Sequence, residues 1–146
     1  MTKRKETIYL AGKITGDPDY REKFAKAART LREAGYVVLN PAMLPPEGFT
    51  YRAYLRMGYA LLDECDMVCL LPDWEGSYGA RLEFVRAAQG DKRVMFYDVF
   101  LQRQRERRAR ETSHTNYAHM VPIEDLKRCF DSIWGEPPTS LRDGKG

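Results

Sequence analysis

A short apolar run at residues 67–71, within the segment DMVCLLP, most constrains the fold. Residues that are apolar at successive positions, without alternation, are typical of a strand covered on both faces, as in the parallel sheets of α/β proteins. Three other short segments rich in β-branched and aromatic residues predict further strands. They are TIYLA (7–11), YVVLNP (36–41) and RVMFYD (93–98). We therefore expect a parallel sheet with helices on both faces.

Amphipathic segments separate these strands. A helix is expected to begin at Asp17 and Pro18, since aspartate caps free amide groups and proline tolerates the first helical position, and to end at Gly35. Apolar residues at helical spacing predict two more helices, over 51–65 and roughly 80–89. The alternation of strands and helices predicts an α/β fold, a doubly wound parallel sheet of four or five strands in three α/β/α layers. HMVPI (119–123) is the candidate fifth strand.

The length of 146 residues suits one domain. We expect a single domain over residues 1–134, with a core at 7–97, a helical extension at 99–134 and a disordered tail at 135–146, which has little to bury. No apolar run is long enough to cross a membrane, and the opening residues pass directly into a strand rather than a secretory leader. A cytoplasmic protein without a membrane partner is expected.

Metal, cofactor and nucleic-acid binding are not expected. The three cysteines lack the paired spacing of a zinc site, and we interpret Cys65 and Cys69 as packing residues. His114 and His119 have no evident third ligand. Arginines recur between positions 103 and 110, but interleaved glutamates and the absence of stacking aromatic residues favour a solvated helix or one packed on a partner subunit.

A binding site is expected where the carboxyl ends of the strands meet, because ligands of open parallel sheets bind there. This rule selects the loops 11–17, 40–50 and 72–79. Gly12 and Gly16 in the first loop allow backbone amides to approach an anion such as phosphate, or they only make a tight strand-to-helix turn. The pattern GKITG leaves both interpretations open.

The segment WEGSYGARLEF (74–84) carries the strongest chemical candidate, Glu83. A carboxylate in the first turn of a helix is kept ionised by the helix dipole, and an ionised carboxylate can attack the anomeric carbon of a sugar. The alternative is that Glu83 only caps the helix or lies on the surface.

Three segments together resemble a known family. IYLAGKITG, GYVVLNP and CDMVCLLPDWEGSYGARLEF, in this order and spacing, are similar to the nucleoside 2-deoxyribosyltransferase superfamily, and most of all to its uncharacterised phage and bacterial branch. The resemblance covers residues 7–97. It implies a Rossmann-like or flavodoxin-like fold, cleavage or transfer at the N-glycosidic bond of a deoxynucleoside or its 5′-monophosphate, no cofactor, and a homodimer or higher homo-oligomer.

The resemblance also implies roles for single residues. The nucleophilic glutamate of the family falls on Glu83, and the tyrosine that could hold it falls on Tyr9. Where relatives acting on free nucleosides carry aspartate, this chain has Ser77, which leans towards a phosphorylated ligand. Asp73 is a third catalytic candidate. The remaining candidates for substrate contacts are Gly12, Ile14, Gly16, Asn40, Trp74 and Gly79. Trp74 either stacks on a base or covers the core.

One position departs from the family pattern. Active relatives carry an aspartate eight residues before the aspartate that opens the third strand, and it positions or protonates the departing base. This chain has Gly58 there. Loss of a general acid typically costs two to four orders of magnitude in rate. Asp63, Asp73 or Glu75 could substitute, the base could leave without this acid, or the protein could bind a nucleotide without turnover.

Overall fold

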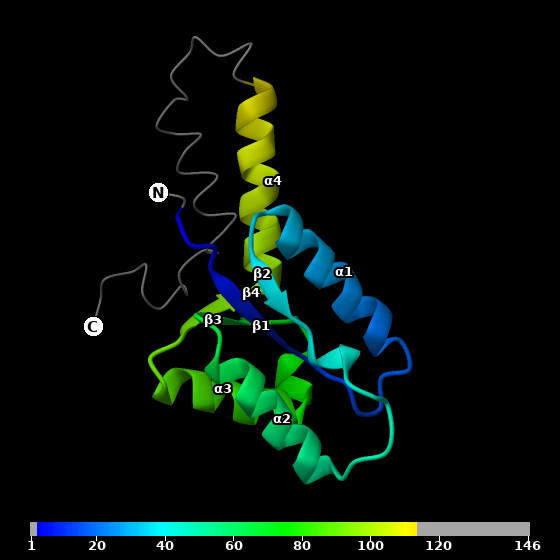
Figure 1. The fold of residues 1–146 in the computed structure, drawn as a ribbon. Helices are drawn as coiled ribbons and strands as arrows, with labels where there is room; N and C mark the ends of the chain where they lie inside the picture. The colour runs from blue at the N-terminus through cyan, green and yellow to red at the C-terminus, as the bar shows by residue number, and fades with distance from the viewer. Residues whose placement is uncertain (1–2, 114–146) are drawn as a thin grey trace, which may run out of the picture. The chain divides into compact units, whose positions relative to one another are not determined.

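The computed structural model describes residues 3–113. The chain divides into two compact units, residues 1–106 and 107–146, and of the second only 107–113 are described. The first unit contains a four-stranded parallel sheet in the order β2-β1-β3-β4 (Figure 1). Its strands are β1 (Thr7–Ala11), β2 (Val37–Leu39), β3 (Met67–Leu70) and β4 (Arg93–Phe96). The predicted parallel α/β sheet is confirmed.

Helices connect the strands in the expected alternation. They are α1 (Tyr20–Glu33), α2 (Tyr51–Asp63), α3 (Tyr78–Gln89) and α4 (Tyr97–Ser113), with the short 3-10 helices η1 (Pro41–Met43) and η2 (Trp74–Gly76). Successive side chains of a strand point to opposite faces. Ile8 and Leu10 of β1 accordingly pack with α1 and the start of α4, whereas Tyr9 and Ala11 pack with α2 and α3. The sheet therefore lies between two helical layers, as predicted.

The strand order creates a crevice at the carboxyl end of the sheet. β1 is flanked by β2 on one side and by β3 on the other. The connection after β1 therefore leads to β2 at one edge of the sheet, and the connection after β3 leads to β4 at the opposite edge. The loops after β1 and β3 consequently diverge at this point, where doubly wound folds bind their ligands. Ala11 pairs with Leu70 at these strand ends.

Two helices begin at other residues than expected. α1 begins at Tyr20 rather than at Asp17, because the Asp17 carboxylate accepts a hydrogen bond from the amide of Asp19 and turns the chain before the helix starts. α3 begins at Tyr78, two residues earlier than expected, because the Ser77 hydroxyl caps it by accepting from the amide of Ala80 at 3.2 Å. This shift matters for Glu83, which lies in the second turn and not in the first.

Several other expectations concern parts of the chain outside or at the edge of the described residues. The candidate fifth strand, the end of the helical extension, the tail, and His114 and His119 lie outside them. The helix predicted over the arginine-rich segment is present within α4. Cys65 and Cys69 are buried packing residues, as predicted, and burial raises their pKa values to about 11 and about 12. Among residues 3–113 no helix is long and apolar enough to cross a membrane.

Candidate functional site

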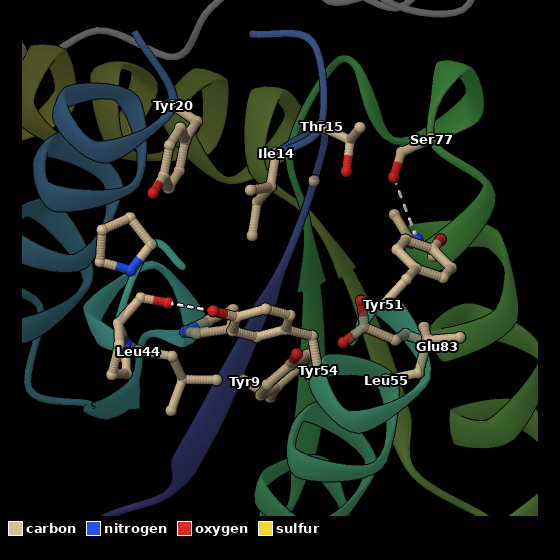
Figure 2. A pocket seen from close by; sticks show the side chains of 16 residues that line it. Tyr9, Ile14, Thr15, Tyr20, Leu44, Tyr51, Tyr54, Leu55, Ser77 and Glu83 are labelled. Atoms are coloured by element: carbon tan, nitrogen blue, oxygen red, sulfur yellow. Dashed lines mark hydrogen bonds between the residues drawn. The ribbon is translucent and has the colours of Figure 1, made fainter. Parts of the chain in front are cut away.

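A pocket of about 320 Å³ opens at the carboxyl ends of β1 and β3 (Figure 2). The loop after β1 supplies one part of its lining, the proline-rich loop after η1 and the start of α2 another, and the start of α3 a third. In Figure 2, Tyr20 and Leu44 lie on the opposite side of the pocket from Ser77 and Glu83. The lining residues are Tyr9, Gly12, Ile14, Thr15, Tyr20, Pro41, Leu44, Pro45, Pro46, Tyr51, Tyr54, Leu55, Ser77, Gly79, Ala80 and Glu83.

Glu83 is the one acidic residue among the described residues that line this pocket. Its side chain is 9% exposed, and its Oε2 atom is buried without a hydrogen-bond partner among the described residues. Burial disfavours the charged carboxylate and raises the pKa of Glu83 to about 7. The expectation that the helix dipole keeps Glu83 ionised is therefore wrong. The group lies one turn too deep in α3, and desolvation outweighs the dipole.

The same geometry excludes a helix-capping role and a surface role for Glu83. Ser77 and not Glu83 caps α3, and Glu83 is the one buried charged residue among those described. A buried carboxyl oxygen without a partner costs free energy unless something else satisfies it. Such a group in a pocket, with a pKa near neutrality, is typical of a functional site.

Tyr9 lies beside Glu83 at the base of the pocket. Its ring is 1% exposed and packs between the sheet and helices α2 and α3. Its hydroxyl interacts with the Glu83 carboxyl group, which lowers the pKa of Glu83 against the effect of burial. Burial and the neighbouring carboxylate raise the pKa of Tyr9 well above its usual value. Tyr9 therefore stays protonated and acts as a donor towards Glu83.

Gly58 in the middle of α2 packs directly against this pair. A β-carbon placed on Gly58 would lie 2.8 Å from the Tyr9 hydroxyl oxygen and 3.3 Å from Glu83 Oε2. The position at which the resemblance implies an acid thus adjoins Glu83. In this chain, however, the adjoining space is filled by the Tyr9 hydroxyl.

An ion-pair cluster fixes the loop that follows β1. Asp73 accepts from the backbone amide of Lys13 at 3.1 Å and forms an ion pair with Lys23. Lys23 also contacts Asp17 at 2.5 Å and donates to the backbone carbonyl of Lys13 at 2.7 Å. Glycine suits position 12, because a β-carbon there would lie 3.0 Å from Leu71 Cβ and 2.9 Å from Leu71 Cδ1. The pocket edge is therefore held by charges that do not themselves line it.

Aromatic and proline side chains form much of the pocket wall. The Tyr54 hydroxyl donates to the carbonyl of Pro45 at 2.5 Å and ties α2 to the proline-rich loop. The Tyr20 hydroxyl accepts from Arg21 at 3.1 Å. The Tyr51 hydroxyl lies near the start of α3, 3.2 Å from where a Gly79 β-carbon would be, and among the described residues no group hydrogen-bonds it. It is therefore available to a ligand.

The structure brings together six of the ten residues expected at the site: Tyr9, Gly12, Ile14, Ser77, Gly79 and Glu83. The other four do not line the pocket. Asp73 clamps the neighbouring loop, and Gly16 makes a turn at φ +83°. Asn40 caps η1, and Trp74 packs on Phe84 with ring centroids 5.2 Å apart. Trp74 thus takes the core-covering role.

The proposed substitutes for the missing acid are also outside the pocket lining. Asp63 is engaged by Arg86 through two hydrogen bonds of 2.8 and 2.7 Å, and Glu75 is exposed in η2. The sequence patterns did not assign the following wall residues to the site: Thr15, Tyr20, Leu44, Tyr51, Tyr54 and Leu55. Within residues 3–113, no three His, Cys, Asp or Glu side chains cluster as a metal site would require.

Comparisons with known proteins agree with this fold. No match is found among curated proteins. A solved structure described as a 2-desoxiribosyltransferase from Leishmania mexicana matches with a TM-score of 0.50 and 22% identity, over 62% of this chain and 63% of that chain. This chain thus corresponds to less than two thirds of that protein. The family model for a domain of unknown function, DUF4406, matches residues 6–96. The chain therefore belongs to the DUF4406 family, and its fold is that of a 2-deoxyribosyltransferase-like α/β domain.

Proposed function

We propose that the protein cleaves or transfers the N-glycosidic bond of a deoxynucleoside or a deoxynucleoside 5′-monophosphate, with Glu83 as the nucleophile. The observation that carries this proposal is the buried Oε2 atom of Glu83 at the base of a pocket, which has no hydrogen-bond partner within residues 3–113. The fold shared with a protein described as a 2-desoxiribosyltransferase supports the class of substrate.

The proposed reaction has two steps. In the first, a carboxylate oxygen of Glu83 forms a bond to the anomeric carbon C1′, and the bond between C1′ and the base nitrogen breaks with its electron pair going to the base. In the second, water or another base attacks C1′ and releases Glu83. Water makes the protein a hydrolase and a second base makes it a transferase. Tyr9 orients the carboxylate by donating to it.

The pocket suits a nucleoside in size and lining. Its volume of about 320 Å³ lies at the lower end of ligand pockets, which commonly hold about 300–1,000 Å³. Aromatic rings such as those of Tyr51 and Tyr20 offer faces on which a base can stack. Thr15 and Ser77 place hydroxyl groups towards the pocket, where sugar oxygens can bind them (Figure 2).

The departing base requires a proton unless it is a good leaving group. No second carboxyl group lines the described pocket, so Tyr51 is our candidate donor. Its hydroxyl has no hydrogen-bond partner among the described residues, and burial together with nearby Tyr78 and Glu83 raises its pKa, which keeps the proton in place. When the bond from C1′ to the base breaks, the proton passes to the base. The tyrosinate then accepts a proton from the attacking water.

The described pocket lining offers hydroxyl groups and backbone amides, but no cationic side chain, to a 5′-phosphate. None of the described lining residues is a lysine or an arginine. Ser77, which suggested a phosphorylated ligand, accepts from the Ala80 amide and keeps its own proton to donate. A 5′-phosphate would be held by backbone amides of the loop after β1 and by hydroxyl groups. Side-by-side rates on each nucleoside and its monophosphate decide between the two.

The test is a panel of deoxynucleosides and their 5′-monophosphates, with and without an acceptor base, analysed by chromatography for free base and for new nucleoside. We expect release or exchange by the wild type and loss of at least about 1,000-fold for Glu83→Ala, since it lacks the nucleophile. Glu75→Ala removes an exposed carboxyl group nearby and is the matched control. No turnover across the whole panel contradicts the proposal.

A second function is favoured by one observation, the absence of another acid in the described lining. In this alternative the same pocket binds a nucleotide without turnover. Binding measured by calorimetry would then be equal for the wild type and Glu83→Gln, and no base would be released. Assembly as a homodimer or higher homo-oligomer also belongs to the proposal, and light scattering of the purified protein measures it.

A further inference from the structure

Gly58 lies at a position where glycine destabilises a helix. It lies within α2, a 13-residue helix, and glycine is the least favourable residue after proline in a helix interior. Elsewhere in the described chain, Gly35 and Gly48 adopt positive φ angles of 100° and 111°, whereas Gly58 has ordinary helical backbone. Backbone conformation therefore does not explain Gly58, and an explanation must come from what surrounds it.

The surroundings leave no room for a β-carbon. One built on Gly58 would lie 2.8 Å from the Tyr9 hydroxyl oxygen, whereas ordinary contacts of such atoms are 3.4 Å or longer. It would also lie 3.3 Å from Glu83 Oε2. The carboxyl end of Glu83 can rotate towards the pocket. The Tyr9 ring cannot yield as easily, because it is 1% exposed and packed between the sheet and helices α2 and α3.

We propose that Gly58 is a positioning residue. Its missing side chain leaves the space in which the Tyr9 hydroxyl reaches the Glu83 carboxyl group, so with α2 packed on β1 as in this chain, the pair and a side chain at position 58 exclude each other. The inference rests on the proposed function in so far as Glu83 is the nucleophile. The steric statement stands without it.

Glycine in place of the aspartate expected at position 58 can be interpreted in two ways. A missing aspartate at this position suggests lost catalysis, and installing it would then restore a proton donor. The geometry gives the opposite expectation. Gly58→Asp forces the Tyr9 hydroxyl away and places a second carboxyl group beside Glu83, so turnover falls instead of rising.

The experiment is a double-mutant cycle between Gly58→Ala and Tyr9→Phe, with readouts that need no substrate. The urea midpoint of unfolding reports stability. The pKa of Glu83 is read by ¹³C NMR on glutamate labelled at Cδ, assigned with Glu83→Gln. Tyr9→Phe removes the offending oxygen, and its ring carbon Cζ lies at an ordinary 3.8 Å from the added β-carbon. Gly76→Ala is the control substitution, since among the described residues only its chain neighbours come within 4 Å of its β-carbon.

With Tyr9 intact, Gly58→Ala should lower the urea midpoint and raise the pKa of Glu83, because the hydroxyl contact is lost. In the Tyr9→Phe background, the same change should leave the pKa unaltered and raise the midpoint through better helix propensity. Gly76→Ala should leave the pKa unchanged and shift the midpoint equally in both backgrounds. If Gly58→Ala alone does not fold, a folded double variant supports the proposal.

Three results would overturn the inference: equal effects of Gly58→Ala in both backgrounds, no effect with Tyr9 intact, or a double variant that also fails to fold. None of these readouts involves catalysis. An inactive protein that nevertheless shows the background dependence would refute the proposed function and leave the role of Gly58 standing.

Discussion

Glu83→Gln is expected to stabilise the protein in a way that depends on pH. Burial raises the folded-state pKa of Glu83 from 4.5 to about 7. Between these values the folded state binds more protons than the unfolded state, so the free energy of unfolding falls as pH rises. Each pKa unit corresponds to about 1.4 kcal/mol, and the wild type thus loses about 3 kcal/mol by pH 8. Glutamine is neutral throughout and avoids this loss.

The assay is urea unfolding of the wild type and Glu83→Gln at several pH values from 4.5 to 8.5. All other titrating groups are shared, so they cancel in the difference between the two free energies. That difference should grow by about 3 kcal/mol across the range and level off above pH 8. Its absolute value at pH 4.5 reflects only how well the amide replaces the protonated carboxyl group.

The control is Glu75→Gln, which removes an exposed carboxyl group from η2. Its free energy of unfolding is expected to follow that of the wild type at every pH. A difference between Glu83→Gln and the wild type that does not change with pH would refute the reasoning, because Glu83 would then be ionised at low pH as in the unfolded chain.

Three further outcomes are expected. Activity should require ionised Glu83, so kcat/KM should fall about tenfold per pH unit below pH 6 and level off near pH 8; a flat profile from pH 5 to 8 contradicts this. Tyr51→Phe should lower kcat about 100-fold on substrates with poorly leaving bases and less on those that leave easily; equal losses would remove Tyr51 as the proton donor. Asp73→Asn should lower the free energy of unfolding by about 1 kcal/mol, less in 1 M NaCl, because it weakens the contacts to Lys23 and to the Lys13 amide; an unchanged value would show that this cluster does not stabilise the loop.

The sequence predicted the fold well because the sheet's signals are local. The unbroken apolar run of β3 and the alternating helical segments determine a parallel sheet almost without tertiary information. Small errors in the boundaries had larger consequences. Reading α3 as starting near residue 80 placed Glu83 in the first turn. The Ser77 cap moves the helix start to Tyr78, and the pKa of Glu83 rises instead of falling.

The rule for parallel sheets predicted the part of the site that follows strand ends, and Tyr9 was named only through the family resemblance. Gly12, Ile14 and Ser77 lie in the loops selected by the rule for parallel sheets. Tyr51 and Tyr54 appeared in the sequence as part of an apolar helix stripe, and only the packing of α2 beside the sheet turns these rings into a pocket wall. The meeting of Gly58 with Tyr9 depends on how deeply α2 lies on β1, which no local pattern encodes.

Identification of a covalent intermediate would test the central claim most directly. The protein is incubated with a deoxynucleoside bearing a fluorine at C2′, which slows release of the sugar, and intact mass is followed by peptide mapping. The account predicts an added sugar on the peptide that contains Glu83 and none on Glu83→Gln. Base release without any adduct on Glu83, or an adduct on another residue, would contradict it.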